Sequence, residues 1–454
     1  MTKYWINETS SRMWGGHRVG IIRVEDEIKK TPQYQPFLRS EFGFLASDTF
    51  VNQIIPNLFS SSNKSTTNDP KIRNFLNQAF FIPKYLRLQR ILGYSVSFLY
   101  GRNRTFDRVI LLFSSKMYKT ILNLAKQKKS LISSVRYPLK PRNPEFNLAE
   151  FSKLEHPFQP GDCVISVGLD WDTKSLEYLS RIKAEIDIKI ISCIYDLIPV
   201  TNPEFIANER HSLLLMKHFT LVAKNADLVF VNSKTVENHF NKFCLEIGVQ
   251  TPSIARIPWG FEEFSSLSST QPIEIDAETF PFVLAVGTFE IRKNYGLLLS
   301  IVNYAHENQI AIPKIIIVGR AGWGTADLQS SLRLNKTWSS KVTWLSNVSD
   351  SELKWLYQHA AAYINPSFDE GFGLPVVEAI NAKVPVILSD IAIFRELFPE
   401  ATFASPNDPV SWVGILNCLT FGEQIAPKRS FKIYSWDEVR QIVLNKIMLW
   451  EQNK

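Results

Sequence analysis

The segment Phe368–Ala379 places two carboxylates around a glycine-rich turn and reads Phe-Asp-Glu-Gly-Phe-Gly-Leu-Pro-Val-Val-Glu-Ala. It follows a predicted strand and opens a predicted helix, where the proline at a first helical position needs no amide hydrogen. Gly371 and Gly373 let backbone N–H groups approach a ligand closely. Helix-end amides at the carboxyl edge of a parallel sheet bind anions and hydroxyls. We therefore predict a ligand site in which one of Glu370 and Glu378 holds a sugar hydroxyl and the other holds a ribose.

Two adjacent cations, Arg292 and Lys293, follow a predicted strand and a glycine turn at Gly287. Such a pair neutralises a diphosphate, and an arginine does so through two parallel hydrogen bonds. The alternative here is a cation pair in solvent. In the carboxylate segment the alternative is a helix-capping Glu370 with Glu378 on a solvated helix face.

The two segments together resemble the donor site of a known family. The Glu-Gly-Phe-Gly-Leu-Pro-Val-Val-Glu-Ala block and the Val-Gly-Thr-x-Glu-x-Arg-Lys-Asn pattern are similar to the large retaining GT-B glycosyltransferase family usually called family 4. The resemblance implies that Arg292 and Lys293 stabilise the departing nucleoside diphosphate, with Glu370 as the third catalytic residue. It also implies a metal-free donor site, in which the backbone at Val348 contacts the base, formed by Gly20, Gly287, Gly319, Val348, Gly371, Phe372, Gly373, Leu374 and Glu378.

Three segments in the first half of the chain resemble the same family. Gly20–Glu25 matches the glycine loop that faces the donor phosphate and the acceptor, so Arg23 is a candidate phosphate or acceptor ligand. A packing or surface role is the alternative for this arginine. Tyr195–Pro199 resembles the family's His-Asp-Leu-Ile-Pro segment with tyrosine in place of histidine, so the histidine's role is not carried over. Asp196 is expected to order the acceptor side, and Ile257–Gly260 matches the hinge into the second domain.

Apolar strands alternate with segments of helical periodicity, most regularly in the second half. There we predict strands at Phe282–Val286, Lys314–Val318, Val342–Leu345, Ala362–Asn365 and Val384–Leu388, and helices at Tyr295–His306, Asp350–His359, Pro375–Ala382 and Val410–Leu419. In the first half we predict strands at Tyr4–Asn7, Asp162–Val167, Ile188–Ile194 and Leu228–Val231, and helices from Ile21 and over Phe205–Lys224. The alternation indicates an α/β fold with parallel sheets covered on both faces. With the resemblance, the predicted fold is GT-B, in which two Rossmann-like, doubly wound domains face each other across a cleft.

The division into domains follows from length and pattern. A chain of 454 residues is too long for one hydrophobic core, and the serine-rich segment Pro258–Pro281 has no periodicity. We predict an acceptor-side domain over residues 1–265, a donor-binding domain over 275–435 and a terminal helix within 436–454. Residues from about 36 to 160 fit no βαβ unit, so we interpret them as a basic insertion in the first domain.

The insertion contains a strongly basic stretch. Residues 82–142 hold fourteen Lys or Arg and a single acid, Asp107, although the net charge of the whole chain is +7. Apolar residues at helical spacing between Ile110 and Leu124 predict an amphipathic helix. This helix either packs on a core with a solvated face or rests on an anionic membrane, where each basic residue contributes about 1 kcal/mol. No recognisable nucleic-acid module accompanies the charge, so nucleic acid is not a predicted partner.

The composition, with 45% hydrophobic and 21% charged residues, is that of an ordinary globular protein. The four cysteines are far apart, which argues against a disulfide framework or a zinc site and fits a reducing compartment. The seven histidines show no metal-ligand spacing, and His17, in the glycine loop, is left open. The first ten residues lack an apolar core, and no apolar run approaches about 18 residues. We therefore predict a cytoplasmic protein, peripheral on the membrane if the basic stretch binds lipid.

The resemblance implies transfer of a sugar from a nucleotide-sugar to a saccharide or lipid-linked saccharide, with retention of configuration and without a metal or other cofactor. The Tyr-Asp-Leu-Ile-Pro version of the acceptor segment is similar to bacterial polysaccharide and O-antigen mannosyl- and rhamnosyltransferases, which favours GDP-mannose as donor. The alternative is a catalytically inactive GT-B scaffold at the membrane in a polysaccharide assembly complex, and the four intact donor-site charges argue against it. A GT-B sugar phosphorylase or epimerase ranks behind both, and the sequence lacks the context of a pyridoxal-phosphate lysine that a phosphorylase needs.

Overall fold

The computed structural model describes residues 2–13, 20–40, 43–46, 156–168, 174–206, 208–261, 268–276, 279–422 and 431–453. Residues 36–158 form one compact unit, and residues 1–35 together with 159–454 form another. The basic stretch 82–142 and His17 lie outside the described residues, so the predictions made for them stay predictions. At the start of the smaller unit, β2 (Tyr34–Ser40) pairs antiparallel with β3 (Gly43–Ala46).

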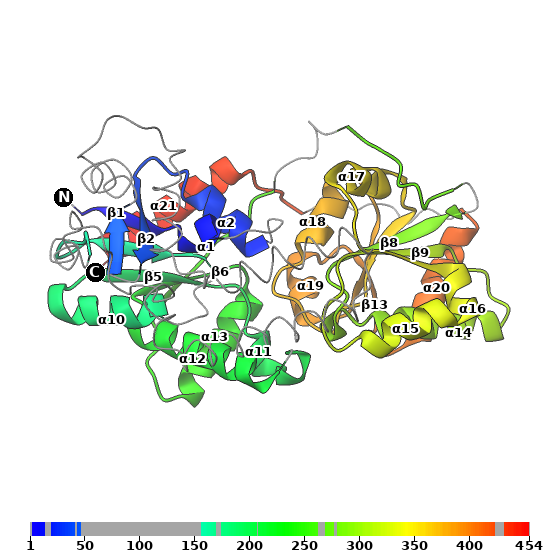
Figure 1. The fold of residues 1–454 in the computed structure, drawn as a ribbon, viewed down its shortest axis with the longest axis horizontal. Coiled ribbons are helices and arrows are strands. Elements are labelled where there is room, and N and C mark those ends of the chain that lie inside the picture. The colour runs from blue at the N-terminus through cyan, green and yellow to red at the C-terminus, as the bar shows by residue number, and fades with distance from the viewer. Residues whose placement is uncertain are drawn as a thin grey trace, which may run out of the picture. The chain divides into compact units, whose positions relative to one another are not determined.

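Five parallel strands of the larger unit form a first sheet. Their order is β1 (Tyr4–Asn7), β4 (Cys163–Ser166), β5 (Lys189–Ile194), β6 (Leu228–Val231) and β7 (Ser253–Arg256). Every residue of β4 and β6 is buried, as expected for strands covered on both faces. One face packs against α10 (Lys174–Ile186), α12 (Glu209–Asn225) and α13 (Lys234–Glu246), and the other against α2 (Gly20–Ile28) and α21 (Trp436–Gln452) (Figure 1).

Six parallel strands form the second sheet of the larger unit. Their order is β10 (Val342–Leu345), β9 (Lys314–Val318), β8 (Phe282–Val286), β11 (Ala362–Asn365), β12 (Val386–Ser389) and β13 (Thr402–Ala404). The chain runs outward from β8 through β9 to β10 and then returns to β11 on the other side of β8. The strand order therefore reverses between β8 and β11, where ligands of doubly wound sheets bind.

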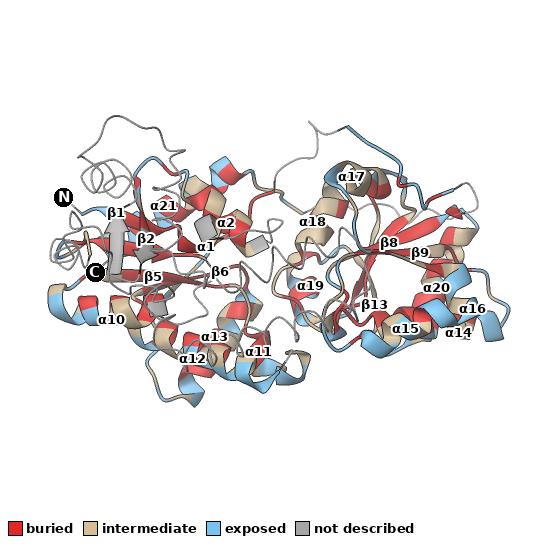
Figure 2. Cartoon of the chain, in the orientation of Figure 1, coloured by how far each residue is buried: buried red, intermediate tan, exposed pale blue. Residues whose placement is uncertain are grey.

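Helices cover both faces of the second sheet, and Figure 2 shows the buried residues concentrated between the layers. One face packs against α14 (Tyr295–Glu307) and α20 (Pro409–Thr420), and the other against α17 (Asp350–His359), α18 (Leu374–Asn381) and α19 (Ala392–Leu397). The shorter helical segments of this unit are α1 (Thr9–Met13), α11 (Ile198–Thr201), η2 (Pro203–Phe205), η5 (Ile291–Lys293), α15 (Ala326–Leu334) and α16 (Lys336–Lys341).

The C-terminal helix α21 returns to the first sheet. Trp436, Val439, Val443 and Ile447 are buried in the same core as β1, β4 and β5. A Cβ added at Gly260 would lie 2.5 Å from the Trp436 indole, so glycine is needed where the chain leaves the first domain. The chain therefore connects the two sheets twice.

The predicted strands agree with the structure to within two residues. The helix predicted over Phe205–Lys224 begins instead at Glu209, because the Asn208 side chain accepts the His211 N–H and fixes the first turn there. Strands β7 and β13 were not predicted, since each is partly exposed and lacks the continuous apolar run of the buried strands. Among the described helices, none combines the length and apolarity needed to cross a bilayer.

Candidate active site

The loops that follow β8 and β11 lie at the point where the strand order reverses. Phe368 N–H donates to the Arg292 carbonyl at 3.0 Å, which joins the two loops through their backbones. Asn294, in a left-handed conformation, ends η5 and begins α14. Its amide nitrogen donates to the Pro366 carbonyl at 3.0 Å and to the Pro406 carbonyl at 2.8 Å. These bonds fix the backbone that carries Arg292 and Lys293.

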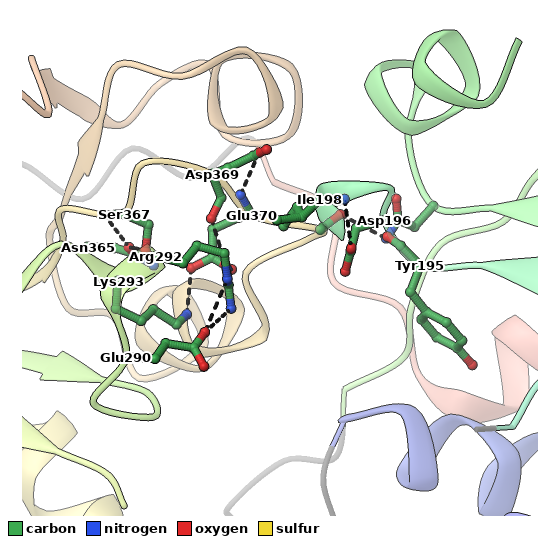
Figure 3. A network of polar contacts seen from close by, with 12 residues as sticks. Tyr195, Asp196, Ile198, Glu290, Arg292, Lys293, Asn365, Ser367, Asp369 and Glu370 are labelled. Atoms are coloured by element: carbon green, nitrogen blue, oxygen red, sulfur yellow. Dashed lines mark hydrogen bonds and ion pairs between the residues drawn. The ribbon is translucent and has the colours of Figure 1, made fainter. Parts of the chain in front are cut away.

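The structure brings the three predicted catalytic residues into direct contact (Figure 3). Lys293 Nζ lies 2.5 Å from Glu370 Oε1, and Arg292 Nη1 lies 2.6 Å from Glu370 Oε2. Ser367 Oγ donates to Glu370 Oε1 at 2.8 Å. On its other side Arg292 donates to Glu290 Oε1 from Nε and Nη2, at 3.1 and 2.8 Å. Two cations and two carboxylates thus form one network at the sheet edge.

Burial and charge both act on the ionisation of this network. Burial alone would raise the pKa of Glu370, but the charges of Arg292 and Lys293 and their hydrogen bonds outweigh it. The pKa of Glu370 therefore lies well below its ordinary range, and the carboxylate is ionised at neutral pH. Burial lowers the pKa of Lys293, and the Glu370 carboxylate opposes that shift. An ionised carboxylate bound by two cations is a weak proton acceptor and is well suited to hold those cations in place.

Helix α18 begins directly after the Glu370 loop. Gly373 is its N-cap residue with φ +95°, a left-handed conformation that favours glycine, and Pro375 is in the first turn. The first amides of a helix lack partners within the helix and attract negative charge. Gly371, Phe372, Gly373 and Leu374 all line the same pocket as Arg292 and Lys293. The loop therefore presents backbone donors beside the cations.

Glu378 lines this pocket one turn further along α18. Its Oε2 accepts a hydrogen bond from the Tyr357 hydroxyl of α17 at 2.9 Å. Burial raises the pKa of Glu378, while this bond and the positive charge of Arg23 oppose the shift. The two glutamates of the motif thus lie in different surroundings, Glu370 among cations and Glu378 beside a tyrosine.

The first domain contacts the Glu370 loop through the ends of β5 and β6. A Cβ added at Gly371 would lie 2.9 Å from the Tyr195 carbonyl and 3.1 Å from Asp196 Cβ. Asn232 Nδ2 donates to the Gly371 carbonyl at 2.9 Å and to the Tyr195 carbonyl at 3.1 Å. Asp196 lines the pocket, and its Oδ1 accepts the Ile198 N–H at 3.1 Å. Burial raises the pKa of Asp196, and the charge of Arg292 opposes the shift.

The tyrosine that replaces the family's histidine has a structural contact. The Tyr195 hydroxyl donates to the Val167 carbonyl, and its ring stacks on Trp259 with centroids 5.3 Å apart. Its side chain points away from the Arg292–Glu370 network (Figure 3). Tyr195 therefore supports the first domain and does not bring its hydroxyl to the cations.

A pocket of about 1320 Å³ contains nearly all of the predicted site residues, with walls from both domains. Arg23, Asp196, Gly287, Gly319 and Val348 line it together with the network and the α18 loop. Gly20 is the first residue of α2, next to Ile21, which also lines the pocket. Sequence reasoning did not single out Glu290, Asn232, Tyr357 or Arg320. Glu290 lies within the quoted motif and Arg320 directly follows the predicted site residue Gly319, whereas Asn232 and Tyr357 are brought to the site only by folding.

Gly319 and Gly287 pack backbone against backbone. Gly319 has φ +154°, and a Cβ added to it would lie 1.9 Å from the Gly287 carbonyl oxygen. We expect Gly319→Ala to cost about 2–4 kcal/mol through overlap and strain, lowering Tm by roughly 5–15 °C. Gly414→Ala is the matched control, because Gly414 lies in α20 with nothing within 4 Å of an added Cβ. Equal melting temperatures for the two variants in a thermal unfolding experiment would contradict this packing.

Among the described residues, no group of three or more His, Cys, Asp or Glu could hold a metal ion. The metal independence that the resemblance implies stays a prediction.

Two Rossmann-like domains whose strand ends share one pocket define the GT-B class of glycosyltransferase folds. The HepE protein of Anabaena, solved with UDP and glucose, shares this fold with a TM-score of 0.55. The superposition covers 99% of this chain and 100% of that one at 14% identity, so it bears on the fold alone.

Residues 270–413, which contain most of the second domain, match the family described as Glycosyl transferases group 1. The chain is 34% identical to the serotype-specific mannosyltransferase WbdA of Escherichia coli over 174 residues, which are 37% of this chain and 21% of WbdA. It is 26% identical to the O-antigen chain mannosyltransferase RfbU of Salmonella typhimurium over 270 residues, 55% of this chain and 74% of RfbU. The chain thus spans about a fifth of the length of WbdA.

Proposed function

We propose that this protein is a glycosyltransferase that moves a sugar from a nucleotide-sugar to a saccharide or lipid-linked saccharide acceptor. The observation that carries the proposal is the buried network of Arg292, Lys293 and Glu370 at the reversal of strand order, beside the first turn of α18. The match of residues 270–413 to Glycosyl transferases group 1 supports it independently.

The proposed chemistry follows from where charge develops. Breaking the bond between the anomeric carbon and the diphosphate leaves negative charge on the diphosphate and positive charge on the sugar ring. Arg292, Lys293 and the amides near Phe372 are placed to stabilise the negative charge. We propose that Glu378 holds the ribose and that the sugar lies on the side of Asp196. The acceptor oxygen then bonds to the anomeric carbon, and its proton passes to the departing phosphate.

Retention of configuration belongs to this proposal. Both oxygens of Glu370 accept hydrogen bonds from cations, and its pKa is depressed, which supports a role in holding the cations over a role as nucleophile. The anomeric coupling constant of the product, measured by NMR, tests retention. A glycosyl group trapped on Glu370 and found by mass spectrometry would contradict the proposed mechanism, in which the acceptor attacks on the same face that the diphosphate leaves.

GDP-mannose is the proposed donor. The relatives WbdA and RfbU are named as mannosyltransferases, and the name of RfbU assigns it to the O-antigen chain. We therefore propose a role in polysaccharide or O-antigen biosynthesis. The test is mannose incorporation from labelled GDP-mannose into oligosaccharides and lipid-linked saccharides extracted from a polysaccharide-producing bacterium. Incorporation that requires Glu378 supports the proposal, and donor binding without turnover in every extract would favour the scaffold.

The reaction is expected to proceed without a divalent metal ion. Arg292, Lys293 and the α18 amides supply the positive charge that a metal would otherwise bring to the diphosphate. We expect transfer measured after exhaustive treatment with EDTA to keep its rate. A rate that falls with EDTA and returns with Mg²⁺ or Mn²⁺ would show that the metal-free prediction is wrong.

A further inference from the structure

The charged groups that line the pocket nearly balance one another. The cations are Arg23, Arg292, Lys293 and Arg320, and the acids are Asp196, Glu290, Asp350, Glu370 and Glu378. Arg292 and Lys293 are paired with the buried carboxylates Glu290 and Glu370 at 2.5–2.8 Å. The charges of this foursome cancel, so it offers little net attraction to a diphosphate approaching from solution. A further cation would add to the contacts that Arg292, Lys293 and the α18 amides can make with a bound diphosphate.

Arg320 is placed to do so. It follows β9 and Gly319 directly, and its carbonyl accepts the Phe289 N–H at 2.7 Å. This bond fixes its backbone against the loop that carries Arg292. The Arg320 residue is exposed, and its guanidinium has no hydrogen bond or ion pair to any residue that the structure describes.

Arg23, another arginine of the lining, has different surroundings. It comes from α2 of the first domain, and its charge acts on Glu378. Arg320 belongs to the second domain, on the loop that packs against Gly287. The free cation on the donor side of the described pocket is therefore Arg320, and a guanidinium on a fixed backbone matches two phosphate oxygens at once.

We propose that Arg320 binds the diphosphate of the donor as a third cation and supplies the net positive charge that the paired Arg292 and Lys293 lack. This proposal rests on the proposed function of the same pocket. The alternative is that Arg320 is a solvated surface residue, which would contribute nothing to diphosphate binding. The two roles of Arg320 are distinguished by whether its substitution weakens the binding of nucleoside diphosphates while leaving the binding of nucleosides unchanged.

The test is calorimetric titration of GDP, UDP and the nucleosides guanosine and uridine into the wild type, Arg320→Ala and Arg320→Lys. Arg333→Ala is the matched control, because Arg333 is exposed in the same domain and lies over Trp344, away from the pocket lining. We expect Arg320→Ala to lower the affinity for nucleoside diphosphates by about 10- to 100-fold, the usual effect of losing a hydrogen bond between charged groups. Nucleoside affinity, the melting temperature and the control should not change, and Arg320→Lys should recover part of the loss.

Three outcomes would overturn the proposal. Unchanged diphosphate affinity in Arg320→Ala, while Lys293→Met loses it, would leave the proposed function standing and make Arg320 a surface residue. An equal loss of affinity for nucleosides and for nucleoside diphosphates in Arg320→Ala would show that Arg320 does not act on the phosphates. Failure of the wild type to bind any nucleoside diphosphate would overturn the proposed function and this inference together.

Discussion

Replacing Lys293 with methionine is expected to lower the rate of sugar transfer by about 10²–10³-fold, the usual cost of removing one group that stabilises developing negative charge. Methionine keeps much of the apolar volume of the lysine stem but has no charge. Lys293 is buried, and its Nζ lies 2.5 Å from Glu370 Oε1. The loss should appear in donor affinity as well as in kcat, because the positive charge acts on the bound diphosphate and on the charge that develops as the diphosphate departs.

The measurement is initial-rate kinetics for nucleoside diphosphate release with saturating donor. Lys336→Met, an exposed lysine at the start of α16 outside the pocket lining, is the matched control. Near-ultraviolet circular dichroism should show that both variants are folded. A Lys293→Met enzyme that transfers sugar as fast as the control would mean that this cation does not act on the leaving group.

Replacing Glu370 with glutamine should destabilise the fold by about 3 kcal/mol, because the buried Lys293 and the half-buried Arg292 would lose a charge that compensates them. Glu370 is 7% exposed, and it accepts bonds from Arg292, Lys293 and Ser367. The expected decrease in Tm is roughly 10 °C. Asp390→Asn is the control, since Asp390 and Arg395 form an exposed pair whose loss should leave the Tm nearly unchanged.

The stability difference between wild type and Glu370→Gln should depend on pH in a defined direction. The pKa of Glu370 is depressed in the folded state, so its contribution is fully present above the unfolded value of 4.5. That contribution is lost as the pH falls below 4.5 towards the folded pKa. Asp369, whose pKa burial raises to about 6, acts in the opposite direction, and its burial is common to the two proteins. A difference in Tm that stays constant from pH 7 to pH 3 would contradict the buried ion network.

The sequence was sufficient to predict five of the six strands of the second sheet, because these are short apolar runs between segments of helical periodicity. The resemblance of two separate motifs to one family implied that Glu370, Arg292 and Lys293 belong to the same site. That Glu370 neutralises the two cations could not be predicted. This depends on Asn294 and Ser367, whose side chains fix the two loops, and on burial at the sheet edge.

Other parts of the site depend on contacts between segments that are distant in sequence. Tyr357 reaches Glu378 from the preceding helix, and Asn232 of the first domain binds the Gly371 carbonyl, 139 residues away. Neither residue belongs to a recognisable motif. Tyr195 illustrates the reverse case: the sequence marked it as a departure from the family, and only the structure shows its hydroxyl held by Val167. Arg320 lies beside a predicted glycine, but its lack of a described partner is visible only in three dimensions.

The central claim is that the pocket at the reversal of strand order binds a nucleotide-sugar through Lys293 and its partners. The most direct test is thermal stabilisation and slow hydrolysis with GDP-mannose, UDP-glucose, UDP-GlcNAc and dTDP-rhamnose, each measured for the wild type and Lys293→Met. We expect one nucleotide-sugar, GDP-mannose by our proposal, to raise the Tm of the wild type and to be hydrolysed slowly, with both effects lost in the variant. If no nucleotide-sugar and no free nucleoside diphosphate changes the Tm of the wild type, the pocket is not a donor site and the account is contradicted.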